Sequence, residues 1–152
     1  MVAELLTHYD ASTARDHFRA VVREAVRDER PVLVKPRDEE AVVVLARTQL
    51  LELLASYQPH IEIIPENEDG GFAVWIEELR VTAYGESFAA AREAATDEAI
   101  TVVQHLLHEW PRLKHTDRAA DLPYIARLSL AGTREEFRAL LFSRLEAPVQ
   151  AT

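Results

Sequence analysis

The sequence predicts an α+β protein in which a helix–hairpin–helix segment precedes a small antiparallel sheet packed by a long helix. Three patterns support this fold class: an amphipathic helical stretch followed by two β-branched runs, an Asp-Gly turn between two later apolar runs, and a long alanine-rich helical stretch. Pro59 and Pro111 divide the 152-residue chain, so we expect domains over residues 1–58, 59–110 and 111–152.

The first domain is expected to fold as a helix, a hairpin and a second helix. Ser12 is a suitable N-cap for a helix that runs to about Asp28. β-branched runs over 32–34 and 41–45 predict the two strands of the hairpin. The apolar side chains that recur at helical spacing and should form one buried stripe are Ala14, Phe18, Val21, Val22 and Ala25.

The second domain is expected to be three strands and a packing helix. Strands are predicted over 61–64, 72–76 and 81–84, with Asp69-Gly70 as the tight turn between the first two. The helix should begin at Ser87. In the third domain, residues 122–130 fit a strand or an apolar helix equally well, and a capping box begins a further helix at Thr133.

Composition excludes several classes of protein. Apolar residues make up 48% of the chain, which is enough for a hydrophobic core. The absence of cysteine excludes disulfides and thiolate metal sites. No apolar run approaches the about 20 residues that a membrane helix needs, and the acidic N-terminus does not fit a secretory signal. We therefore expect a cytoplasmic protein without membrane contact.

Acidic charge is concentrated in the middle of the chain. The net charge of −9 divides into −2 for residues 1–58, −9 for 59–110 and +2 for 111–152. An acidic module attracts a basic protein and repels nucleic acid. A solvated, solubilising surface explains the same charge equally well.

The first domain resembles the Phd/YefM family of antitoxins of RelE-type toxin–antitoxin systems. The resemblance covers residues 8–57 and rests on Ser12-Thr13-Ala14-Arg15, Pro31-Val32-Leu33-Val34-Lys35 and Ala41-Val42-Val43-Val44-Leu45. It implies a homodimer whose basic residues contact operator DNA, which by position are Arg15, Arg19, Lys35 and Arg37. Three acids, Asp38 to Glu40, follow Arg37 in the hairpin turn, and their repulsion would offset part of this attraction to phosphate.

The second domain resembles the HicB antitoxins. The matching residues are Glu68-Asp69-Gly70-Gly71-Phe72-Ala73-Val74-Trp75-Ile76 and Tyr84-Gly85-Glu86-Ser87-Phe88, followed by an alanine-rich helix. This resemblance implies a layer of sheet and helix that covers a toxin.

A metal-dependent nuclease is the main enzymatic alternative, because Glu66, Glu68 and Asp69 provide neighbouring carboxylates. These acids cluster on a turn rather than on rigid elements, where solvated charges are the commoner explanation. The sequence therefore favours a binding role for this acidic turn.

Other residues with catalytic or metal-binding chemistry are also explained by structure. His105 and His108 lie three apart on a predicted helix without an evident third ligand. Ser129, His115 and Asp117 lack the strained turn of a nucleophile, and a chain with four glycines has no glycine-rich phosphate loop. We expect no catalytic residue, metal or cofactor.

These observations predict a non-enzymatic antitoxin. The N-terminal domain is expected to dimerise and to bind operator DNA, which would autoregulate its operon. The acidic residues Glu66, Glu68 and Asp69 are expected to bind a basic ribonuclease toxin. The alternatives are a DNA-binding transcriptional regulator without a toxin and, third, an uncharacterised enzyme.

Overall fold

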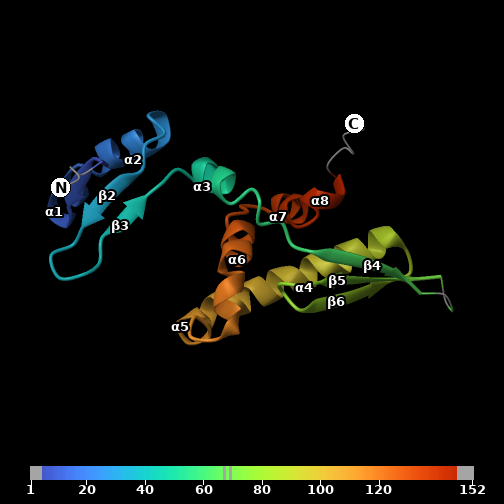
Figure 1. The fold of residues 1–152 in the computed structure, drawn as a ribbon. Helices are drawn as coiled ribbons and strands as arrows, with labels where there is room; N and C mark the ends of the chain where they lie inside the picture. The colour runs from blue at the N-terminus through green and yellow to red at the C-terminus, as the bar shows by residue number, and fades with distance from the viewer. Residues whose placement is uncertain (1–4, 67, 69, 147–152) are drawn as a thin grey trace. The chain divides into compact units, whose positions relative to one another are not determined.

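The computed structural model describes residues 5–66, 68 and 70–146 (Figure 1). It confirms a mixed α+β protein with two three-stranded sheets. The chain divides into two compact units, unit 1 (Met1–Leu53) and unit 2 (Leu54–Thr152), each of which contains one sheet. Within the described residues, no helix has the length and apolar character that crossing a bilayer requires.

Unit 1 is a small sheet covered by helices. The strand order is β1-β2-β3, in which β1 runs parallel to β2 and β2 runs antiparallel to β3. The strand β1 was not predicted, because three residues are too few to show a periodicity. The elements are β1 (His8–Asp10), α1 (Ala11–Asp16), α2 (Phe18–Arg27), β2 (Val32–Lys35), β3 (Val42–Val44) and α3 (Arg47–Leu53).

The first predicted helix is divided into two. It begins at Ala11, because the Asp10 carboxylate accepts a hydrogen bond from Thr13 N–H at 2.7 Å, so the expected N-cap at Ser12 is wrong. The same hydrogen bond lowers the pKa of Asp10. The helix breaks at His17, whose φ of −119° and ψ of 36° are not helical. Phe18 therefore begins a new helix, α2, with its own orientation.

The core of unit 1 is small. Only part of the predicted apolar stripe is buried, together with Val32 of β2: these buried residues are Ala14, Val21, Ala25 and Val32. Phe18 and Val22, which were expected in that stripe, are exposed. Phe18 and Val22 recur with Val26 at a spacing of four on α2, which places them on a face beside that of the buried Val21 and Ala25.

Unit 2 begins with an antiparallel sheet in the order β4-β5-β6, covered on one face by a long helix (Figure 1). Its elements are β4 (Ile61–Pro65), β5 (Phe72–Ile76), β6 (Val81–Gly85), α4 (Phe88–His108), α5 (Trp110–Leu113), the 3-10 helix η1 (Asp117–Asp121), α6 (Leu122–Ser129), α7 (Arg134–Leu141) and α8 (Ser143–Glu146). The undecided stretch 122–130 is therefore helical.

Small residues bring α4 close to the sheet. The Ser87 hydroxyl caps the helix by accepting Ala90 N–H at 3.1 Å. Three alanines one turn apart, Ala91, Ala95 and Ala99, are fully buried against the sheet. At Gly85, a Cβ atom would lie 2.1 Å from the amide nitrogen of Ala91, so no other residue fits at this close approach.

The helices after Trp110 share the hydrophobic core of the sheet. Ile125 and Leu128 of α6 and Leu141 of α7 are fully buried in the same cluster as Val74 of β5. On the surface, Glu93 of α4 receives Arg134 at 2.7 Å and Arg138 at 2.5 Å, and these guanidinium groups lower its pKa.

Candidate functional site

The basic side chains of unit 1 are spread over two helices and the hairpin. Arg15 lies in the last turn of α1, where it pairs with Asp16 at 3.1 Å, whereas Arg19 lies on α2 beyond the break. Lys35 ends β2, where it is the register partner of Asp10, and Arg37 is exposed in the turn that follows. The expected DNA-contacting residues thus come from separate elements.

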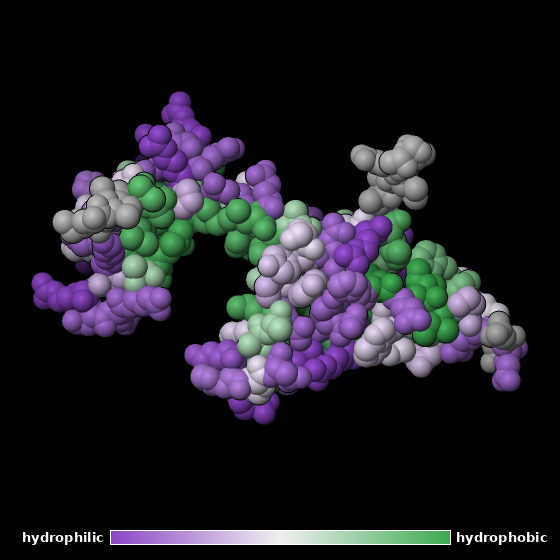
Figure 2. Space-filling view, viewed as in Figure 1, coloured by the Kyte–Doolittle hydropathy of each residue, from purple (hydrophilic) through white to green (hydrophobic). Residues whose placement is uncertain are grey.

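A second surface of unit 1 is apolar. Phe18, Val22 and Val26 recur every four residues on α2, and Phe18 and Val26 are 62% and 59% exposed. We call these three residues the α2 ridge. Arg19, Arg23 and Arg27 run beside it and line the same open groove. Figure 2 shows hydrophobic residues at the visible surface in the region of α2 and β2.

The sheet of unit 2 has one face that α4 does not cover. Strand pairing places two rows of side chains on this face, and we call them the open sheet face: Glu62, Trp75, Thr82, Ile64, Ala73 and Tyr84. Tyr84 is 63% exposed and Ile64 44% exposed, while Trp75 is half-buried. Of the two aromatic residues on β5, Phe72 points the other way and contacts Phe88 of α4 at 6.2 Å between ring centroids.

The acidic β4–β5 turn lies at one end of the open sheet face. Glu66 N–H donates to the Gly71 carbonyl at 2.8 Å, which closes the turn, and the side chains of Glu66 and Glu68 are exposed. Asp69, the third expected toxin-binding residue, lies outside the described residues. Glu66 lines one open depression with Tyr84 and Glu86, so carboxylates border the exposed tyrosine. Glu86 was not among the toxin-binding residues expected from the sequence.

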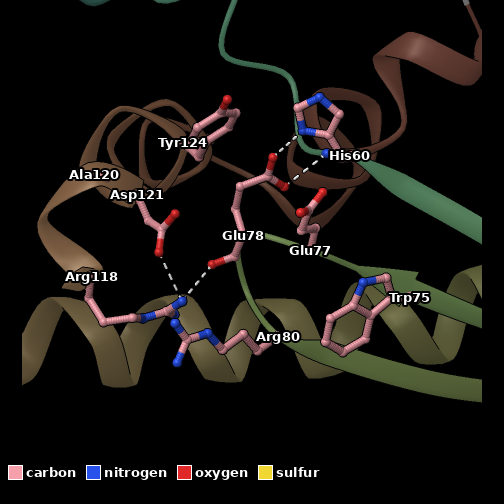
Figure 3. A pocket seen from close by; sticks show the side chains of 9 residues that line it. All are labelled: His60, Trp75, Glu77, Glu78, Arg80, Arg118, Ala120, Asp121 and Tyr124. Atoms are coloured by element: carbon pink, nitrogen blue, oxygen red, sulfur yellow. Dashed lines mark hydrogen bonds and ion pairs between the residues drawn. The ribbon is translucent and has the colours of Figure 1, made fainter.

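The opposite end of the sheet carries a polar cavity of about 710 Å³ (Figure 3). Arg118 is buried and donates to the Glu78 carbonyl and to the Asp121 carboxylate, both at 2.9 Å. Burial raises the pKa of Asp121, although the Arg118 charge opposes this effect. Arg80 pairs with Asp117 at 3.1 Å. These contacts attach η1 to the turn between β5 and β6.

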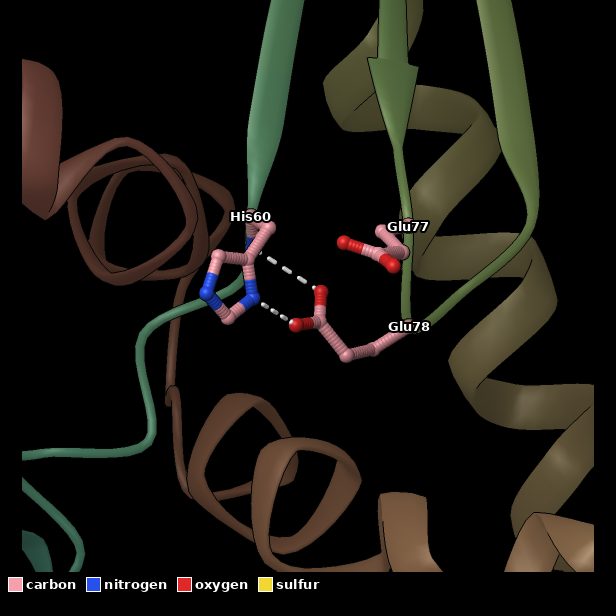
Figure 4. A group of neighbouring side chains, drawn as sticks. All are labelled: His60, Glu77 and Glu78. Carbon is pink, nitrogen blue, oxygen red and sulfur yellow. Dashed lines mark hydrogen bonds and ion pairs between the residues drawn. The ribbon is translucent and has the colours of Figure 1, made fainter.

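Three side chains at this cavity can serve as metal ligands: His60, Glu77 and Glu78 (Figure 4). Glu78 is only 7% exposed and accepts His60 N–H at 2.9 Å, while its other oxygen contacts His60 Nδ1. No local pattern predicts this group, because His60 and the two glutamates are distant along the chain and two adjacent glutamates resemble ordinary surface charge.

The other residues considered for chemistry have structural roles or lie on the surface. The Ser129 hydroxyl donates to the Ala126 carbonyl at 2.7 Å, and Asp117 pairs with Arg80, so neither is aligned with His115 in a triad. His105 and His108 are exposed on α4.

Similarity to known proteins identifies the class to which this fold belongs. Residues 5–143 match the PHD-like family, described as antitoxin of toxin-antitoxin, RelE / RelB, TA system. The chain therefore belongs to this antitoxin family. No curated protein matches the chain.

A solved structure has the same fold. It is the crystal structure of an antitoxin part of a candidate toxin/antitoxin system from Syntrophomonas wolfei subsp. wolfei. The TM-score is 0.73 at 20% sequence identity, and the match covers 89% of this chain and 96% of that chain. An antitoxin implies a cognate toxin as its partner and a regulatory rather than an enzymatic role.

Proposed function

We propose that this antitoxin neutralises a basic, ribonuclease-type toxin by direct binding through the open sheet face and the acidic β4–β5 turn. One observation carries the proposal: the sheet is covered by α4 on one face and exposes Tyr84 and Ile64 on the other, beside the carboxylates of Glu66 and Glu86. The proposal retains Glu66, Glu68 and Asp69 as toxin-binding residues. In it, β4 to α4 act as the HicB-like layer that covers the toxin.

The two kinds of side chain would contribute differently to the complex. Exposed aromatic residues are the typical anchors of protein interfaces, because they bury a large area and lose few rotamers. The acidic turn would attract a toxin whose surface is basic because its substrate is RNA, and such attraction raises the association rate more than the final affinity. The net charge of −9 over residues 59–110 acts in the same direction.

The toxin-binding surface is tested by reversing the charges of the turn. The triple variant Glu66→Lys, Glu68→Lys and Asp69→Lys should slow association with the cognate toxin by about tenfold or more at low salt. The loss should shrink at high salt, because screening removes the steering. Surface plasmon resonance at two salt concentrations measures both effects.

The matched control reverses three consecutive acids of unit 1, Asp38 to Glu40, and changes the net charge of the chain by the same amount. It should leave the association rate near that of the wild type. Equal rates for the two triple variants at low salt would show that net charge, and not the β4–β5 turn, steers the toxin. An unchanged rate in the β4–β5 variant would exclude this turn from binding.

Unit 1 is proposed to be the homodimerisation module expected from the Phd/YefM resemblance. A symmetric dimer would bury the α2 ridge of both protomers, and because these six side chains are already about half-buried, the gain is at most roughly 5–9 kcal/mol. Association costs about 4–15 kcal/mol, so further apolar contacts are required. Val42 and Val43 of β3, each 54% exposed, are suited to provide them.

The dimer is tested by placing charges on the exposed ridge. Phe18→Asp combined with Val26→Asp should convert the dimer to a monomer at concentrations of tens of micromolar, roughly the regime of a weak dimer, as measured by analytical ultracentrifugation. Because both side chains are exposed within unit 1, the circular dichroism spectrum should be retained. Val21 is 1% exposed, so Val21→Asp would disrupt the core instead.

The control for the dimer is Ala20→Asp, an exposed position on another side of α2. It should leave the dimer intact. A wild-type chain that sediments as a monomer, or a folded double variant that remains dimeric, would contradict dimerisation through the ridge.

DNA binding by unit 1, with autoregulation or as a toxin-independent regulator, is the second candidate function. It rests on the positions of Arg15, Arg19, Lys35 and Arg37 at the surface of α1, α2 and the hairpin.

Arg15→Ala combined with Arg19→Ala should weaken binding to promoter DNA for all sequences alike. The slope of log K against log salt should decrease in magnitude by about 2. Lys114→Ala with Arg144→Ala, in unit 2, is the control. Failure of the wild type to shift promoter DNA at low salt, with or without toxin, would exclude this function.

A further inference from the structure

Backbone contacts hold His60, Glu77 and Glu78 together at one end of the unit 2 sheet. The β4–β5 ladder continues one step beyond its last assigned pair, because Glu77 N–H donates to the His60 carbonyl at 3.0 Å. His60 and Glu77 are therefore cross-strand neighbours, whose side chains lie close to each other. Glu78 is fixed from the other side, since Arg118 binds its carbonyl at 2.9 Å. Backbone contacts, rather than flexible loops, thus position all three residues.

The possible ligand atoms of these three side chains lie close together. One imidazole nitrogen and one oxygen from each carboxylate lie within 4.8 Å of one another. Figure 4 shows the Glu77 and Glu78 carboxylates on the same side of the sheet edge as the His60 ring. A small adjustment of the exposed His60 and Glu77 side chains around the buried Glu78 carboxylate would place all three atoms about 2.0–2.2 Å from one ion, the distance of Zn²⁺ to imidazole and carboxylate ligands.

Among the described residues, the arginines at this cavity are paired with aspartates, whereas Glu77 is not paired. Arg118 is paired with Asp121 (Figure 3). Arg80 is paired with Asp117. The Glu77 carboxylate makes no hydrogen bond or ion pair with any described residue, and the Glu78 carboxylate contacts only His60 among them. Glu77 therefore brings an unpaired carboxylate to the cavity beside that of Glu78, and such a pair of carboxylates attracts a divalent cation.

From these observations we infer that His60, Glu77 and Glu78 form a binding site for a divalent transition-metal ion, with Zn²⁺ as the ion that fits best. One imidazole and two carboxylates are typical zinc ligands, whereas Mg²⁺ and Ca²⁺ prefer ligand sets made of oxygen alone. Three protein ligands leave a fourth position for water or for a group supplied by a partner. The site would join the start of β4 to the β5–β6 turn, so bound metal would stabilise unit 2.

Direct binding is the test, with ZnCl₂ as the probe and the full-length, tag-free chain as the protein. Isothermal titration calorimetry should show one Zn²⁺ bound per chain, and millimolar Mg²⁺ should not displace it. At a Zn²⁺ concentration about 100-fold above the dissociation constant, the Tm should rise by about 5–10 °C. Glu77→Gln should weaken Zn²⁺ binding at least about tenfold and remove most of this rise.

Glu77→Gln is the decisive variant because the Glu77 side chain has no contact that folding depends on, so the apo Tm should not change. Glu86→Gln, an exposed glutamate at the other end of the sheet, is the matched control and should bind Zn²⁺ like the wild type. His60→Ala should abolish binding. If the wild type does not bind Zn²⁺, or Glu77→Gln binds it with unchanged affinity, the three-ligand site is wrong and the contact of His60 with Glu78 is structural only. Binding that survives in His60→Ala would place the ion elsewhere, for example at the exposed His105 and His108.

Discussion

The close approach of α4 to β6 is the constraint on which the rest of unit 2 depends. Ala91, Ala95 and Ala99 form a buried seam along the first half of α4, and a methyl group at Gly85 would already overlap the helix backbone. A larger residue anywhere in this seam would push the helix away from Val74 and Ala83 and open voids that close packing does not tolerate. The helix is thereby fixed, and α6 and α7 can pack on its remaining surface.

Fixing α4 on one face determines what the other parts of the sheet are free to do. The opposite face leaves Tyr84 and Ile64 exposed, and the two ends of the sheet differ in chemistry. One end carries the acidic β4–β5 turn, whereas the other holds His60, Glu77 and Glu78 in a polar cavity. Partner binding and metal binding can therefore coexist on one rigid support, which is the arrangement that precise sites require.

Local patterns predicted the fold well, and non-local contacts account for what they missed. The Asp-Gly turn, the β-branched strands and the Ser87 cap each act within a few residues, so β4 to α4 follow from the sequence, whereas the residues of α6 fitted a strand equally well. The break at His17 and the pairing of β1 with β2 depend on tertiary packing. A periodic pattern in the sequence therefore does not predict them. The same holds for the sites. An acidic turn is visible as a run of charge, but His60 meets Glu77 and Glu78 only after β4 and β5 have paired.

We propose that unit 2 binds a toxin through the sheet face that α4 leaves open. Hydrogen–deuterium exchange of the chain alone and in complex with its cognate toxin is the sharpest test of this proposal. If the open sheet face binds the toxin, exchange should slow on binding in the edge strands β4 and β6 and in the β4–β5 turn, with little change along the exposed side of α4. Protection confined to α4 and the helices that follow it, with the open sheet face unchanged, would show that the toxin binds another surface.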